Sequence, residues 1–117
     1  MASTLLILND PPYGTERSYN ALRLARALLD KGAGQVRVFL MGDAAACAHG
    51  GQKVPQGYYN IGDMLGAVIR RTGQVAVCGS CMDARGIGAD VLVAGAERGS
   101  MDILSTWTAE ADKVIVF

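Results

Sequence analysis

The sequence predicts a single-domain α/β protein in which helices cover both faces of a mainly parallel sheet of about five strands. Short apolar runs alternate with segments of helical periodicity, a pattern typical of right-handed strand–helix–strand crossovers. Half of the 117 residues are hydrophobic, which is enough for a buried core. No low-complexity linker or internal repeat divides the sequence, so we treat residues 1–117 as one domain.

Two of the predicted strands are nearly continuous apolar runs. Thr4–Asn9 is the first, and Val36–Met41, interrupted only by Arg37, is the second. Such runs are expected of strands that are buried on both faces of a sheet. Three shorter strands are predicted at Gln74–Val77, near Val93–Glu97 and at Val114–Phe117. The rest of residues 79–99 has no clear periodicity.

Helices are predicted between these strands. The first begins near Thr15, whose hydroxyl can cap it, and ends at Gly32, because glycine favours helix termination. A short helix is predicted over Ala44–Ala48. Gly50–Tyr59, which is rich in glycine and contains a proline, is predicted to be a surface loop with exposed tyrosines.

The clearest helical pattern lies between residues 61 and 69. Apolar residues occur there at the spacing of one helix face, namely Ile61, Met64, Leu65, Val68 and Ile69. A last helix is predicted from about Ser100 to Glu110. Its buried residues are predicted to be Ile103, Leu104 and Trp107.

The charge balance and the amino-terminal sequence restrict the class of protein. Eleven basic residues equal eleven acidic ones, so the chain lacks the overall positive charge of a dedicated nucleic-acid binder. The opening residues have no basic segment, and their apolar run is too short for a signal peptide or a membrane span. We therefore expect a cytoplasmic protein that binds neither nucleic acid nor membrane.

Two of the three cysteines form a Cys-x-x-Cys motif, Cys78-Gly-Ser-Cys81. Cys78 follows a predicted strand, and functional groups of open α/β sheets gather beyond the carboxyl ends of strands. A helix beginning after Cys78 would offer backbone N–H groups to a thiolate, and Arg85 would add a positive charge. The motif therefore indicates redox, sulfur or metal chemistry in a chain without an export signal.

Two other interpretations of the cysteines remain open. Cys78 can be an ordinary packed residue at a strand end, because free cysteine is among the most buried residue types. A tetrahedral zinc site could be formed by three sulfur ligands and one nitrogen ligand, from Cys47, Cys78, Cys81 and His49. Cys47 is more typical of a packed small residue and His49 of a loop residue, so we expect neither a metal nor a cofactor.

Several segments carry a family resemblance through their common order and spacing. They are Asn9–Glu16, Phe39–Ala44, Gly51–Lys53, Gly57–Ile61, Cys78–Ile87 and Trp107–Val114. Together they cover nearly the whole chain and resemble the DsrE/DsrF-like family, most closely its YchN-like branch. The resemblance implies a doubly covered parallel sheet and a homo-oligomer, either a trimer or a hexamer built from two trimers.

The resemblance also implies roles for particular residues. In the related sulfur-relay proteins, the cysteine that carries sulfur as a persulfide lies eight residues before the glycine of an Arg-Gly pair. Cys78 has this position relative to Arg85 and Gly86. Cys81 matches the second cysteine of the YchN-like branch.

We therefore expect an intracellular sulfur carrier or sulfurtransferase-like protein that holds sulfane sulfur as a persulfide on Cys78. Cys81 is the candidate resolving thiol, and Arg85 is the candidate neighbouring cation. The expected partners are sulfur donor and acceptor proteins or small sulfane-sulfur compounds. The alternative is a non-catalytic oligomeric module that binds a ligand or senses oxidation.

Overall fold

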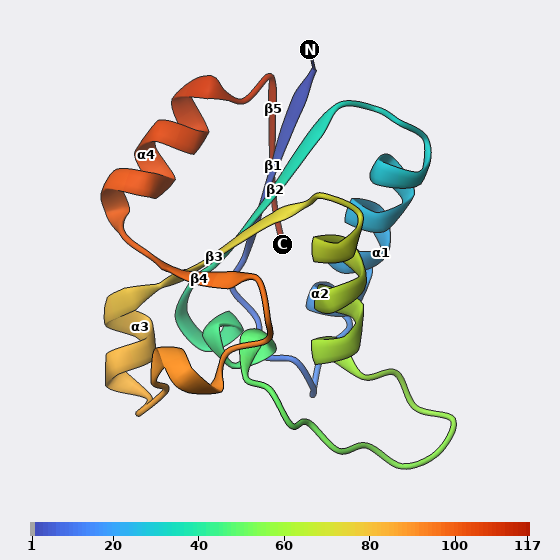
Figure 1. Cartoon of the computed structure of the whole chain (residues 1–117), viewed down its shortest axis with the longest axis vertical. Helices are drawn as coiled ribbons and strands as arrows, with labels where there is room; N and C mark the ends of the chain where they lie inside the picture. Colours follow the sequence, from blue (N-terminus) through green and yellow to red (C-terminus); the bar gives the residue numbers. More distant parts are fainter. Residues whose placement is uncertain (1) are drawn as a thin grey trace.

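A five-stranded parallel sheet organises the computed structural model, which describes residues 2–117 (Figure 1). The strands are β1 (Ser3–Leu8), β2 (Gln35–Leu40), β3 (Gln74–Cys78), β4 (Ala96–Gly99) and β5 (Lys113–Val116). The α-helices are α1 (Arg17–Asp30), α2 (Ile61–Arg70), α3 (Gly79–Ala84) and α4 (Met101–Glu110). Two short 3₁₀ helices are η1 (Gly42–Ala48) and η2 (Ala89–Val91). The predicted fold class is confirmed.

The strand order β4-β3-β2-β1-β5 explains why helices cover both faces of the sheet. From β1 to β4 the chain moves across the sheet in one direction, and β5 then returns to the far side of β1. Right-handed crossovers place helices on opposite faces when the direction reverses. Figure 1 shows this arrangement, with α1 and α2 on one side of the sheet and α4 on the other.

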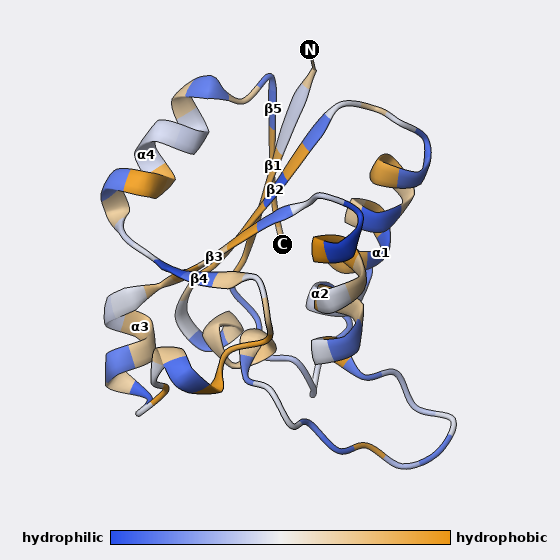
Figure 2. Ribbon diagram, in the orientation of Figure 1, coloured by the Kyte–Doolittle hydropathy of each residue, from blue (hydrophilic) through white to orange (hydrophobic). Residues whose placement is uncertain are grey.

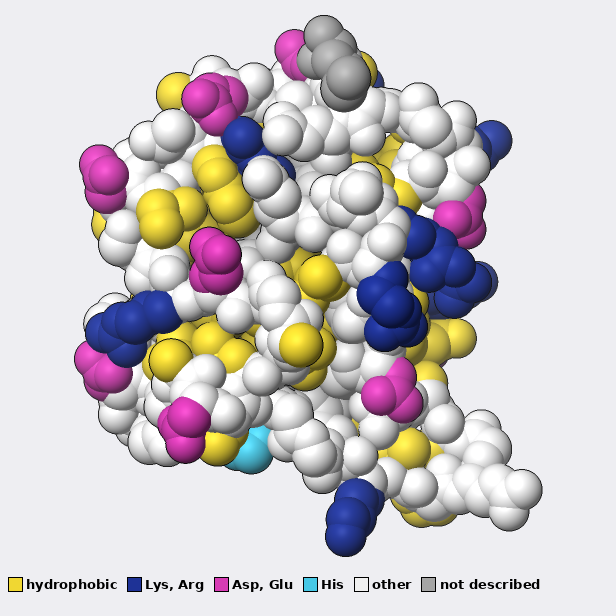
Figure 3. All heavy atoms as spheres, in the orientation of Figure 1, with side chains coloured by type: hydrophobic (Ala, Val, Ile, Leu, Met, Phe, Trp, Pro, Cys, Tyr) yellow, Lys and Arg dark blue, Asp and Glu magenta, His cyan; other side chains and the backbone are white. Residues whose placement is uncertain are grey.

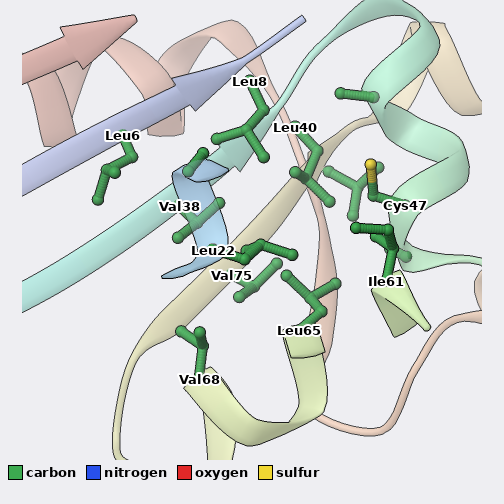
Figure 4. Close-up of a cluster of buried hydrophobic side chains, with 14 of the residues drawn as sticks. Leu6, Leu8, Leu22, Val38, Leu40, Cys47, Ile61, Leu65, Val68 and Val75 are labelled. Carbon is green, nitrogen blue, oxygen red and sulfur yellow. The ribbon is translucent and has the colours of Figure 1, made fainter. Parts of the chain in front are cut away.

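The larger part of the core lies between the sheet and helices α1 and α2. Alternate residues of β1 and β2 point into it, because successive side chains of a strand face opposite sides. Figure 4 shows these side chains meeting those of the helices, with Leu6, Leu8, Val38 and Leu40 facing Leu22, Leu65 and Val68. In Figure 2 the central strands β2 and β3 carry hydrophobic, orange stretches, whereas the edge strand β4 is largely blue.

The opposite face of the sheet has a thinner cover, provided by α4. Leu104 is buried there against Leu5 and Phe39, whereas Ile103 and Trp107 are only half-buried. The prediction that all three α4 residues are buried is therefore wrong for two of them. Trp107 meets Phe39 edge-on, with ring centroids 6.2 Å apart. A single ten-residue helix covers only part of this face, so its flanking apolar side chains keep contact with solvent.

The start of α1 lies slightly later than the sequence predicts, whereas its end lies where it was predicted. The helix begins at Arg17, two residues after Thr15, whose hydroxyl donates to a carboxylate oxygen of Asp10 at 2.9 Å. The same Thr15 oxygen accepts the backbone N–H of Arg17 at 3.4 Å, so Thr15 contacts both the preceding turn and the first residue of the helix. The predicted end is confirmed: the chain leaves the helix through Gly32 at φ +66°, a conformation that glycine adopts without strain.

The segment from residue 49 to residue 60 forms the predicted loop, which extends away from the body of the protein in Figure 1. Tyr58 is exposed, as predicted, with 71% of its surface accessible. Tyr59 is not exposed: it is half-buried and its ring lies 4.3 Å from that of Tyr19 on α1. Aromatic packing onto α1 therefore fixes one end of the loop.

The loop is also held at its base by the side chain of Gln52. Its amide nitrogen donates to the carbonyl oxygens of Cys47 and His49, at 3.1 and 2.9 Å. Its amide oxygen accepts from the Tyr13 hydroxyl at 2.6 Å and from the Gly62 N–H at 3.1 Å. One side chain thus links η1, the first loop and the start of α2.

The bounds of the fourth strand differ from the sequence prediction. It comprises Ala96–Gly99 rather than Val93–Glu97, because the chain turns at Gly95, which has φ +92°. β4 is an edge strand whose Glu97 and Arg98 side chains are exposed, so it lacks the apolar run by which a buried strand is recognised.

On the face shown in Figure 3, several basic side chains gather on the right of the view, whereas acidic side chains are scattered over the face. Within residues 2–117, the helices are all too short or too polar to cross a membrane.

Truncation of Leu65 tests the main core. This α2 side chain is fully buried, so Leu65→Ala should lower the free energy of unfolding by about 2–5 kcal/mol. Met64→Ala, on the neighbouring and half-buried position of the same helix, should cost clearly less because less surface returns to water. Urea denaturation measures both. Equal losses for the two variants would contradict the burial of Leu65 in the main core.

Candidate functional site

Cys78 lies at the carboxyl end of β3 and is also the residue that caps α3. Its half-buried sulfur accepts the backbone N–H of Cys81 at 3.4 Å and lies 3.4 Å from the Ser80 hydroxyl. The strand end and the tight turn into α3 thus surround one sulfur atom with hydrogen-bond donors. This is the position that the sequence predicted for Cys78.

Cys81 lies one helical turn after Cys78, so both sulfur atoms are on the same side of α3. The Cys81 thiol donates to the Cys78 sulfur, and the two sulfur atoms are 2.6 Å apart. The Cys81 sulfur also accepts the backbone N–H of Gly42 at 3.2 Å. Gly42 begins η1 immediately after β2, so the ends of two adjacent strands meet at the cysteine pair.

The hydrogen bonds give the two thiols opposite acidities. Burial opposes ionisation of Cys78, but hydrogen bonds from Cys81 and Ser80 outweigh it and hold the pKa of the Cys78 thiol below its ordinary value. Burial raises the pKa of the Cys81 thiol, and its hydrogen bond to Cys78 raises it further. The pair therefore favours a thiolate on Cys78 and a protonated Cys81.

Arg85 lies on the Cys81 side of the pair. Its guanidinium donates to the carbonyl oxygen of Cys81 at 3.1 Å and to the Asp43 carboxylate at 2.8 Å. Its positive charge lowers the pKa of Cys81, although burial of the thiol has a larger and opposite effect. The contacts of Arg85 therefore connect α3 to η1, and its charge acts on the Cys81 thiol.

Sequence reasoning missed a second arginine beside the cysteine pair. Arg98 of β4 packs its guanidinium against Gly79 and forms two hydrogen bonds of 2.9 Å to Asp83 of α3. The signal that would have located it is strand register, because β4 pairs Arg98 with Val77. The predicted strand, Val93–Glu97, does not include Arg98, so its pairing with Val77 could not be predicted.

The four residues of the zinc alternative do not come together. Cys47 is fully buried in the main core, where Figure 4 shows its sulfur among apolar side chains. His49 is exposed and its ring contacts the Gly50 carbonyl oxygen at 2.7 Å. In the part of the chain that the structure describes, no three histidine, cysteine or acidic residues are arranged to hold a metal ion.

A cavity of about 220 Å³ lies apart from the cysteine pair. Its walls are Gly50–Gln52 of the loop and one side of α2 and its cap, from Asn60 to Arg70. Neither Cys78 nor Cys81 lines it, so the chemistry of the thiols does not extend into this cavity.

The fold and the site together define a class of protein, a parallel α/β domain with a Cys-x-x-Cys thiol pair at the carboxyl edge of its sheet. The model of the DsrE/DsrF-like family matches residues 2–117, and the chain belongs to this family. The resemblance inferred from the sequence is thereby confirmed.

Relatives and solved structures agree with this assignment. Protein YchN of Escherichia coli K12 is 40% identical over 118 residues, which cover both chains completely. A crystal structure of YchN matches the whole of both chains with a TM-score of 0.94. An uncharacterized protein of Methanopyrus kandleri is 35% identical over 96% of this chain and 91% of its own. A protein of unknown function from Methanobacterium thermoautotrophicum, 12% identical with a TM-score of 0.79, shares the fold.

Alkylation rates test the contrast between the cysteines. Burial raises the pKa of Cys47 to about 11, so at pH 7 only about one Cys47 in ten thousand is ionised. Cys78 is more accessible and its pKa is lowered, so brief iodoacetamide treatment at pH 7 should label Cys78 first. Because the thiolate reacts, the rate should fall with pH only once the pH drops below the lowered pKa.

Peptide mapping by mass spectrometry at several pH values provides the measurement. Label found mainly on Cys47, or a pH midpoint for Cys78 at or above that of a free cysteine, would contradict the assignment of the reactive thiol.

Proposed function

We propose that the protein is a cytoplasmic sulfur carrier of sulfurtransferase-like chemistry, holding sulfane sulfur as a persulfide on Cys78. The observation that carries the proposal is the Cys78 sulfur, which accepts hydrogen bonds from the backbone and thiol of Cys81. These donors favour the thiolate, and a thiolate is the form that attacks sulfur. Membership of a family that resembles the sulfur-relay proteins supports the same interpretation.

The loading step requires a donor that contains a sulfane sulfur. The Cys78 thiolate attacks the outer sulfur of a donor persulfide, so a new S–S bond forms at Cys78. The donor's own S–S bond breaks, and its electron pair leaves with the donor thiolate. The lowered pKa of Cys78 and the raised pKa of Cys81 make Cys78 the attacking group.

Cys81 is the proposed resolving thiol. After losing its proton, it attacks the inner sulfur of the Cys78 persulfide, and hydrosulfide leaves with the bonding electron pair. The product is a Cys78–Cys81 disulfide: the two thiols are oxidised and the sulfane sulfur is reduced to sulfide. The 2.6 Å separation of the two sulfur atoms supports this step, since no large backbone movement is needed to join them.

The same separation favours a second candidate function, a redox-sensing module in which the pair cycles between dithiol and disulfide. In that case the protein would respond to oxidants without accepting sulfur. Stoichiometric sulfur loading distinguishes the two functions.

Serine substitutions test the division of labour. Cys78→Ser should abolish loading from a low-molecular-weight persulfide donor, because a serine hydroxyl is essentially un-ionised at neutral pH. Cys81→Ser should still load, and its persulfide should last longer than that of the parent protein, because the nearest attacking thiol is gone. Intact mass spectrometry measures the gain of sulfur and its decay, with Cys47→Ser as the matched control that should behave like the parent.

Two results would contradict these roles. Normal loading and decay in both Cys78→Ser and Cys81→Ser would exclude the pair as the site. Loss of loading in Cys81→Ser alone would show that the roles of the two cysteines are reversed.

We also propose that the protein acts as a homo-oligomer, a trimer or a hexamer. The projecting 49–60 loop with its exposed Tyr58 supports this, since exposed tyrosine is favoured in interfaces. The edge strand β5 adds exposed Val114 and Val116. Apolar side chains at a sheet edge are typical of surfaces that a further chain covers.

Light scattering at micromolar concentration should give a mass three or six times 12.3 kDa. Tyr58→Ala should weaken the assembly because it removes an aromatic side chain from the proposed interface. Arg26→Ala, on an exposed position of α1, is the control that should leave the mass unchanged. A monomeric parent protein would contradict the proposal.

A further inference from the structure

The guanidinium of Arg98 lies against the turn that follows Cys78. Arg98 is on β4, paired in the sheet with Val77, the residue before Cys78. A Cβ atom placed on Gly79 would be only 2.8 Å from both Cζ and Nε of Arg98. The absence of a side chain at Gly79 is therefore what lets a cation approach the backbone next to the reactive sulfur.

Asp83 holds Arg98 in this place. The terminal nitrogens Nη1 and Nη2 each donate to one carboxylate oxygen at 2.9 Å, a bidentate geometry that fixes the plane of the guanidinium. Nε, which faces Gly79, has no hydrogen-bond acceptor among residues 2–117. The side chain of Arg98 is 48% exposed, so a small molecule in solvent can reach it.

Arg98 is also within electrostatic reach of the reactive sulfur. The hydrogen bonds and charge of Asp83 raise the pKa of Arg98, and the charge of the Cys78 thiolate raises it further. Arg85, by contrast, contacts Cys81 and Asp43. Arg98 therefore interacts with the charge of Cys78, whereas Arg85 contacts Cys81.

We propose that Arg98 is a specificity-determining residue that favours sulfur donors with an anionic group next to the sulfur they transfer. This inference rests on the proposed function, in which Cys78 attacks the donor. An anionic donor is repelled by the Cys78 thiolate, and the positive charge of Arg98 offsets that repulsion. The free Nε–H provides a hydrogen bond for a carboxylate or sulfonate oxygen. A neutral donor gains neither effect.

Two alkylating reagents separate this effect from the acidity of Cys78. Iodoacetate and iodoacetamide both react with the thiolate by forming an S–C bond and releasing iodide, and they differ in carrying a carboxylate or a neutral amide. The ratio of their rates at Cys78 cancels the fraction of thiolate, so a change in pKa alone leaves the ratio unchanged. Peptide mapping assigns the labelled cysteine.

The variants around Arg98 should change this ratio in opposite directions. Arg98→Gln should lower the iodoacetate-to-iodoacetamide ratio roughly two- to fivefold, the size expected for one exposed charge. Arg98→Lys should retain much of the parent ratio, because it keeps the charge. Asp83→Asn should raise the ratio, because it removes the anion that partly neutralises Arg98 while leaving a side-chain oxygen that can still accept from its guanidinium. Arg26→Gln, a charge-matched change on α1, should have no effect.

Ionic strength gives a second measurement on the parent protein. High salt should move its ratio toward that of Arg98→Gln, since exposed charges are screened. An Arg98→Gln ratio equal to that of the parent at low salt would overturn the inference. A parent protein that accepts no sulfur, but whose ratio responds to Arg98 and Asp83 as described, would overturn the carrier function and support the anion-selecting role.

Discussion

Parallel pairing of β3 with a strand on each side is the constraint on which the site depends. The register with β2 pairs Leu40 with Val77, so the residues that follow β2 meet those that follow β3, and the Gly42 amide reaches the Cys81 sulfur. The register with β4 brings Arg98 beside the start of α3. A slip of one residue in either pairing would turn side chains to the wrong face of the sheet. The site is therefore a property of the sheet and not of the Cys-x-x-Cys motif alone.

The three cysteines illustrate how strongly environment determines chemistry. Cys47 is enclosed by apolar side chains, and burial raises its pKa to about 11. Cys81 is less buried, yet its role as donor to Cys78 also favours the protonated form. Only Cys78 gains enough hydrogen bonds to offset the cost of burial. Because both members of the pair share one short contact, the acidity of each depends on the protonation state of the other.

Sequence patterns predicted the features that depend on apolar periodicity. The buried strands β1, β2 and β3 and the helix α2 have strong patterns, so the fold class and the position of Cys78 at a strand end followed from them. β4 has no such pattern because it is a short edge strand with exposed side chains, and its misplacement hid Arg98. Side-chain hydrogen bonds were only partly predictable: the Thr15 hydroxyl accepts the first N–H of α1, as expected, but its bond to Asp10 was not predicted.

The sequence predicted that the two cysteines lie together, but it did not predict the contacts of the charged residues around them. Cys78 and Cys81 adjoin because a helical turn brings residues three apart to one face, which spacing alone indicates. The partner of Arg85 is set by the position of η1, and Asp43 lies 42 residues away in the sequence. No local pattern contains that information, since it arises only when β2 and β3 are placed side by side.

A titration of thiolate absorbance in the ultraviolet measures whether the contacts of Cys78 lower the pKa of its thiol. We expect one cysteine of the parent protein to ionise below the ordinary cysteine pKa of about 8.5, and this transition to disappear in Cys78→Ser. We also expect a higher pKa for Cys78 in Cys81→Ala, which lacks the thiol donor. A transition that persists in Cys78→Ser, or a parent protein without any cysteine ionising below the ordinary value, would contradict a lowered pKa at Cys78.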